Sequence, residues 1–148
     1  MPNQYGVLAG KHQQEVNDFP FFFAFSEKQF AEGMASFGLS PEQTDQIYSL
    51  QGTGGFYLRS DAEMLHAMID RHHEEHQAAI AVDTKGDGYI YDMFYYELAN
   101  HEYGYTGEIE DTLNALGITM DDVNADKRFQ RALKKAMQKI EKQTQPAY

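Results

Sequence analysis

The same order of elements occurs twice in this chain, and that repetition constrains the fold more than any other feature. Each copy begins with a short apolar run, continues with a serine that is followed three residues later by Gln or Glu, and ends in a helical pattern. The copies span residues 19–37 and 56–81. Two such copies can pair their strands in one small sheet with the helices on one face. We therefore expect a mostly helical α+β fold with a two-stranded or few-stranded sheet and about five to six helices.

The length of 148 residues suits one domain, because a second independent core would leave too little chain for either. Residues 1–18 are polar and lack a regular apolar period, so they predict a flexible N-terminal arm. Residues 19–143 then form a single α+β domain. There is no signal-peptide-like start and no run near the ~20 apolar residues that cross a bilayer, so we expect a cytoplasmic protein. The absence of cysteine excludes disulfides and thiolate sites.

Helical periodicity predicts four helices besides those of the two copies. Ser40, Pro41 and Gln43 begin one that ends near residues 47–50. Apolar residues at every third or fourth position predict a helix over 89–101 and another from Thr106 to Gly117. The last is a basic amphipathic helix over 126–143.

Charge is divided unevenly along the chain. The formal net charge is −11, yet residues 127–148 hold seven of the twelve Lys and Arg residues and one acid, a balance of +6. The first 126 residues therefore carry −17. An acidic body repels phosphates, so we expect no direct nucleic-acid binding unless the basic helix alone does it. That helix can equally be solvated, lie on the acidic body, or join copies of the chain into a homo-oligomer.

Residues 83–94 resemble a calcium-binding EF-hand loop at first sight, with Asp83, Asp87 and Gly88 at matching positions. The positions that need an oxygen ligand and a bidentate Glu are Lys85 and Phe94. Since both changes remove charge that holds the ion, an ordinary Asp/Gly turn is favoured.

A second possible metal site involves histidines. His72 and His76 have the i, i+4 spacing of two ligands on one helix, and Glu97 and His101 repeat it on the next. If the two helices face each other, these four residues can surround one divalent ion such as zinc. The favoured interpretation is that both histidines border the core and hydrogen-bond to neighbours. No nucleophile motif is present, so no catalytic residue is assigned and no enzyme is expected.

Residues 87–105 combine seven aromatic with four acidic side chains, more than a core alone requires. Tyrosine supplies contact area with a polar tip, and neighbouring carboxylates select a basic partner. In the alternative interpretation, some rings are core and the acids are a solvated face. The candidate binding surface consists of Tyr89, Tyr91, Asp92, Tyr95, Tyr96, Glu97, Glu102, Tyr103, Tyr105, Glu108, Glu110 and Asp111.

Residues 88–103, 105–107, 111–113 and 115–117, together with 22–30 and 32–34, resemble an uncharacterised domain family associated with bacteriophages and other mobile elements of bacteria. The resemblance covers about residues 19–140 and carries no established activity. It implies a context in which small acidic proteins occupy a host or defence protein, some by imitating the charge of nucleic acid.

The leading hypothesis is a non-enzymatic binding protein that inhibits or modulates a basic, nucleic-acid-handling protein. One alternative is a metal-dependent hydrolase that uses the His/Glu site described above. Another is a homo-oligomeric structural or assembly protein built through the basic helix.

Overall fold

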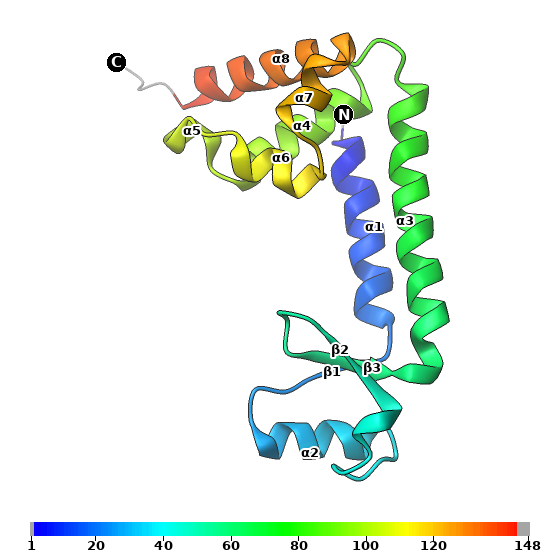
Figure 1. Ribbon diagram of the computed structural model, residues 1–148. Helices are drawn as coiled ribbons and strands as arrows, with labels where there is room; N and C mark the ends of the chain where they lie inside the picture. Colours follow the sequence, from blue (N-terminus) through cyan, green and yellow to red (C-terminus); the bar gives the residue numbers. More distant parts are fainter. Residues whose placement is uncertain (1, 145–148) are drawn as a thin grey trace. The chain divides into compact units, whose positions relative to one another are not determined.

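The computed structural model describes residues 2–144 and shows a mostly helical α+β protein (Figure 1). Two short 3-10 turns, Thr44–Gln46 and Arg59–Asp61, precede β2 and α3. Among the described residues, no helix is both long and apolar enough to cross a membrane. The helices are α1 (Gln4–Asp18), α2 (Glu27–Ser36), α3 (Ala62–Val82), α4 (Tyr89–Asn100), α5 (Tyr103–Thr106), α6 (Glu110–Leu116), α7 (Met120–Asn124) and α8 (Lys127–Gln143).

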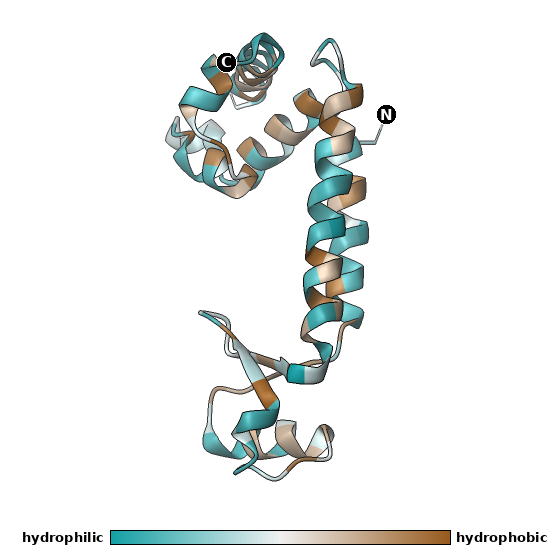
Figure 2. Ribbon diagram, turned by 45° about the vertical axis from the view of Figure 1, so that its right-hand side comes forward, coloured by the Kyte–Doolittle hydropathy of each residue, from teal (hydrophilic) through white to brown (hydrophobic). Residues whose placement is uncertain are grey.

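The chain forms two compact units. Unit 1 contains the described residues of Met1–Gln13 and Glu74–Tyr148, and unit 2 is Gln14–His73. The chain passes between the units within α1 and again within α3. Both of these helices are predominantly hydrophilic along their ribbons, with hydrophobic residues interspersed (Figure 2).

Unit 2 contains a three-stranded antiparallel sheet in the order β1-β3-β2, made of β1 (Phe21–Phe23), β2 (Ile47–Leu50) and β3 (Gly55–Leu58). Phe22 lies opposite Phe56, so the strands of the two sequence copies pair as expected. The helix predicted to end near residues 47–50 is wrong, because those residues form β2. Gly52 and Gly54 adopt positive φ and allow a tight turn from β2 into β3, and pairing with β3 overrides the local helix signal.

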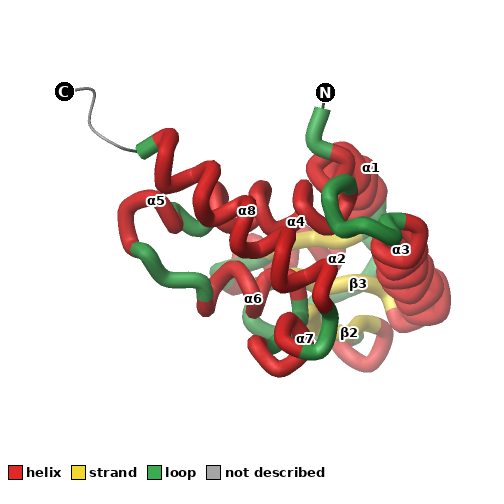
Figure 3. Tube along the Cα trace, turned by 90° about the horizontal axis from the view of Figure 1, so that it is seen from above, coloured by secondary structure: helices red, strands yellow, loops and turns green. Residues whose placement is uncertain are grey.

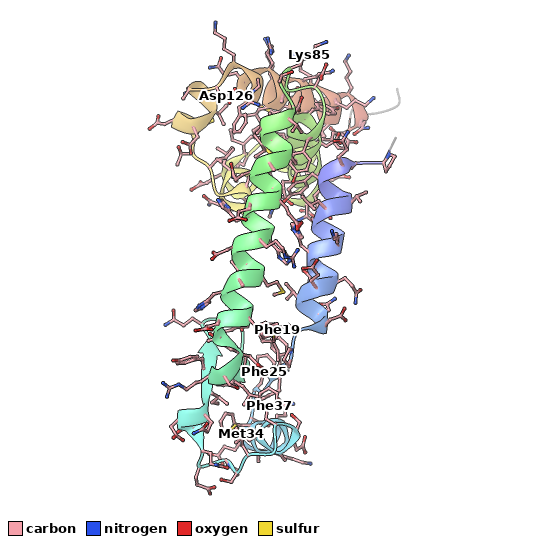
Figure 4. All side chains as sticks on the ribbon, turned by 90° about the vertical axis from the view of Figure 1, so that its right-hand side faces the viewer. Phe19, Phe25, Met34, Phe37, Lys85 and Asp126 are labelled. Atoms are coloured by element: carbon pink, nitrogen blue, oxygen red, sulfur yellow. The ribbon has the colours of Figure 1, made fainter. Side chains whose placement is uncertain are left out.

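Helix α2 forms where its sequence signals predict a helix, and it packs against β1. The Ser26 side chain accepts a hydrogen bond from Gln29 N at 3.1 Å, and Gly38 at φ 75° follows the end of the helix. The ring of Phe22 lies 5.1 to 5.8 Å from those of Phe30, Phe37 and Phe56. Figure 4 shows Met34 and Phe37 in this group of side chains, which forms the core of unit 2.

The core of unit 1 is built around α4. Ile90, Phe94 and Leu98 are fully buried at the spacing of one helical face. Helix α8, the amphipathic helix that the sequence predicted, runs along α4 in both views (Figures 1 and 3) and packs its apolar face against the core. That face consists of Phe129, Ala132, Leu133, Ala136 and Ile140.

The flexible arm predicted for residues 1–18 is wrong for residues 4–18, which form α1; residue 1 lies outside the described residues. Tyr5 and Leu8 pack against the core of unit 1. Asn3 Nδ2 donates to the Asp92 carbonyl oxygen at 3.0 Å, and Gln4 N donates to Asp92 Oδ2 at 2.8 Å. These tertiary contacts stabilise a helix whose local sequence is a weak helix signal.

Candidate protein-binding surface

The candidate binding residues divide into three groups. Tyr89, Glu97 and Tyr103 are buried. Tyr91, Asp92 and Tyr95 are half-buried. The exposed residues are Tyr96, Glu102, Tyr105, Glu108, Glu110 and Asp111.

The three buried side chains hydrogen-bond within unit 1. Tyr103 O–H donates to Glu141 Oε1 at 2.6 Å, and the Tyr89 hydroxyl lies 2.6 Å from His76 Nδ1. Glu97 accepts from Tyr5 O–H at 3.1 Å. Burial raises the pKa of Tyr89 and of Tyr103 to about 12, and the bond to Glu141 adds to the effect at Tyr103. The structure therefore places these three residues in the core of unit 1 and not on its surface.

The half-buried residues support the packing of neighbouring helices. Asp92 accepts the Gln4 bond that holds the start of α1. The Tyr91 and Tyr95 rings stack with centroids 6.0 Å apart, and the Lys135 ammonium lies 5.3 Å from the centroid of Tyr91. Tyr95 O–H donates to Gln143 Oε1 at 2.9 Å.

The exposed residues are concentrated over α5, the start of α6 and the loop between them. Tyr105 is 87% exposed, and the four carboxylates around it in the sequence are exposed as well. Within residues 2–144, none of these four forms an ion pair. We define the acidic α5–α6 surface as Glu102, Tyr105, Glu108, Glu110 and Asp111.

The backbone conformation around α5 helps to orient the side chains of the acidic α5–α6 surface. Glu102 starts α5 in the left-handed conformation at φ 58°, which costs free energy for a residue with a Cβ. Helix α5 then contacts α8 because Gly104 has no side chain: a Cβ there would lie 2.3 Å from Thr144 Cγ2. Since residues two apart point to nearly opposite sides of a helix, Tyr103 faces the core and Tyr105 faces solvent.

The four residues of the possible metal site do not converge on one another: two bond to side chains outside the set, and the other two form a pair on one helix. His72 Nε2 lies 2.7 Å from Glu15 Oε2, and His76 bonds to Tyr89. His101 Nε2 lies 3.2 Å from Glu97 Oε2 on the same helix. Across residues 2–144, no group of three or more His, Asp and Glu side chains has the arrangement needed to hold a metal ion. His72 and His76 each hydrogen-bond to a neighbouring side chain.

The loop that resembles an EF-hand caps α4 instead. The Asp83 carboxylate accepts hydrogen bonds from the backbone N–H groups of Gly86, Gly88 and Ile90 at 2.9 to 3.1 Å. Because these donors occupy the carboxylate oxygens, the loop is a helix-capping turn.

Sequence reasoning missed Tyr5, which joins α1 to the Glu97 carboxylate. A signal was present, because Tyr5, Leu8 and His12 recur at three and four, as on one helical face. Desolvation and the nearby Glu97 carboxylate raise the pKa of Tyr5 well above its usual value.

The model of a family of unknown function, DUF7659, matches residues 4–139. No curated protein matches the chain, and no solved structure does. Since the family model covers most of the sequence, the chain belongs to the DUF7659 family.

Proposed function

We propose that this member of the DUF7659 family is a small, acidic, non-enzymatic protein-binding module. Its acidic α5–α6 surface engages a basic, nucleic-acid-handling protein and inhibits or modulates it. In the context that the phage and mobile-element resemblance implies, that partner is a cytoplasmic host or defence protein.

The observation that carries the proposal is the exposure of Tyr105 among exposed carboxylates. Tyrosine is enriched at binding hot spots, because its rigid ring offers apolar area and its hydroxyl offers a hydrogen bond. An aromatic side chain held almost entirely in water gains by burial against a partner. Exposed carboxylates without ion pairs favour approach of a positively charged surface and lose little intramolecular energy on binding.

The backbone conformation of Glu102 also supports a binding role for the acidic α5–α6 surface. Glycine or asparagine adopts positive φ at less cost than glutamate, so the fold accepts strain of about 1 kcal/mol or more at this position. An exposed carboxylate at a strained position fits a role in binding better than a role in folding.

Affinity capture from a bacterial lysate at low salt tests the proposal. The wild-type protein is compared with the triple variant Glu102→Lys, Tyr105→Ala, Glu110→Lys. The control is Glu32→Lys with Glu42→Lys, two exposed residues of unit 2 that change the net charge by the same amount. Asp92 is left intact because it holds α1.

We expect the wild type and the control to retain one basic protein that high salt releases, and the triple variant to lose it. Equal capture by the triple variant, or equal loss by the control, contradicts the proposal. Light scattering at low and high salt addresses the homo-oligomer alternative, which requires a larger mass at low salt that reversal of α8 cations abolishes.

A further inference from the structure

Helix α8 presents two chemically distinct faces. Its apolar face is buried in the core of unit 1, and its outward face carries only charged and polar side chains. Lys85 lies in the loop between α3 and α4 (Figure 4), and its carbonyl oxygen accepts a hydrogen bond from Arg131 on this face. We define the basic α8 surface as Lys85, Lys127, Arg131, Lys134, Lys135, Lys139 and Lys142, all of them exposed.

These cations are available to a ligand. In the part of the chain that the structure describes, none of the seven forms an ion pair with a carboxylate. Arg128 differs, because its guanidinium donates to Asp126 and to the carbonyl oxygens of Ile80 and Asp83. Arg128 therefore holds the loop between α3 and α4 in place, and it is not part of the basic α8 surface.

Three of the cations surround one hollow. Lys85, Arg131 and Lys135 line an open depression of about 350 Å³, together with Gly86, Ala132 and one acid, Asp87. Arg131 NH2 donates to the Lys85 carbonyl oxygen at 2.9 Å, which connects the loop to α8. Gly86 permits this approach, because a Cβ there would lie 2.8 Å from the Arg128 carbonyl oxygen. Three cations against one carboxylate favour an anionic group.

The length of the surface favours a polymer over a single anion. Seventeen helical residues extend about 25 Å, and neighbouring cations on one helix face lie about 5–6 Å apart. That length spans several consecutive phosphates of a nucleic-acid strand, whereas a single anion would meet only one part of it. The stacked Tyr91 and Tyr95 rings lie beside the surface, with Lys135 over Tyr91, and aromatic rings next to cations are a common support for unpaired bases.

A lipid surface fits less well. Helices that lie on anionic membranes insert an apolar face among the acyl chains, whereas the apolar face of α8 is already buried against α4. The net charge of −11 opposes nucleic acid at long range, but within a Debye length of about 8 Å the local cations dominate.

We propose that the basic α8 surface binds the phosphate backbone of a single-stranded nucleic acid, with one phosphate in the Lys85/Arg131/Lys135 hollow. From the sequence alone, we expect direct nucleic-acid binding only through the basic helix, and this surface adds Lys85 from the neighbouring loop to that helix. The interaction goes beyond the proposed protein partner and uses different residues.

Fluorescence anisotropy with a labelled oligothymidylate of about twelve nucleotides tests this proposal on the purified full chain. At about 50 mM salt we expect micromolar affinity, falling with salt at a logarithmic slope of about −2 to −5, or about 0.7 for each phosphate contacted. The variant Arg131→Glu with Lys135→Glu weakens binding about tenfold or more and flattens the slope by about 1.4. The control Lys11→Glu with Lys28→Glu, two exposed cations outside the surface, makes the same change in net charge and leaves affinity within about twofold.

Absence of binding at low salt overturns the proposal, as does equal weakening in both variants. Binding to anionic phosphatidylglycerol vesicles in place of the oligonucleotide overturns it in favour of a lipid surface. Doubling of the mass at low salt, abolished by the Arg131/Lys135 variant, overturns it in favour of a second copy. The Glu102/Tyr105/Glu110 variant retains oligonucleotide binding, so failure of the proposed function and failure of this inference are distinguishable.

Discussion

The two units of this chain use apolar residues differently. In unit 1, α4 is covered by neighbouring helices and leaves Ile90, Phe94 and Leu98 with no exposed area. In unit 2, Met34 alone among the described residues is fully buried, and Phe25 is 78% exposed. Strands of three or four residues have little surface to bury, so unit 2 depends on ring packing around Phe22. A central helix forms a deeper core than a short sheet with a comparable supply of aromatic residues.

The largest effect is expected from removing a central side chain of each unit. Phe94→Ala leaves a cavity under α8 and should lower the free energy of unfolding by about 3–5 kcal/mol, whereas Met34→Ala should cost about 2–5 kcal/mol. Chemical denaturation measures both values. If hydrogen exchange rises only in residues 14–73 for Met34→Ala, unit 2 opens by itself. A rise throughout the chain for both variants would remove the distinction between the units.

A smaller effect is expected from adding a methyl group at Gly33, which packs directly against the Phe22 ring. In Gly33→Ala, the new Cβ would lie 2.0 Å from Phe22 Cδ1, so the ring must move away from Phe30 and Phe56. We expect a loss of about 1–3 kcal/mol in thermal or chemical unfolding. Gly10→Ala, which meets no atom within 4 Å, serves as the control and should be neutral or stabilising. Equal stability of Gly33→Ala would show that the ring packing is loose.

The attachment of α1 to unit 1 is tested by Tyr5→Phe. This change removes the hydroxyl that donates to the Glu97 carboxylate and keeps the ring against Tyr89 and His76. We expect a loss of about 1–2 kcal/mol, with faster hydrogen exchange in residues 4–13. Tyr105→Phe, an exposed ring, provides the matched control and should leave both quantities unchanged.

The smallest effect concerns the response of Glu15, in unit 2, to low pH. Hydrogen bonds from Arg71 and His72 hold the pKa of Glu15 at about 2. Because the folded-state pKa lies below the unfolded one, this contribution is present above about pH 4.5 and is lost as the pH falls towards 2. The stability difference between wild type and Glu15→Gln, from denaturation at pH 6 and pH 3, should shrink at the lower pH. A constant difference would mean that the ionised carboxylate has no part in it.

Local signals in the sequence predicted much of the fold. The Ser26 cap, the glycine that ends α6 and the Asp126 cap all lie at helix boundaries, because capping depends on a few adjacent residues. The sequence mispredicted residues 47–50 and 4–18. Their conformation depends on strand pairing in the first case and on contacts with α4 in the second.

The candidate surface was predicted only in part, for a related reason. Composition located the acidic and aromatic segment but could not separate Tyr103 from Tyr105, which face opposite ways on one short helix. Tyr103 lies on the side of α5 that packs in the core, and the close approach of Gly104 to Thr144 is a contact between residues far apart in the chain.

The sequence alone determined the class of fold, the boundaries of the helices with clear caps and the division into an acidic body and a basic helix, because these depend on residue type and near neighbours. Only the tertiary structure decided which side chains reach solvent. Burial of Glu97 and Tyr89, and the gathering of Lys85 with Arg131 and Lys135, follow from the packing of distant segments against one another.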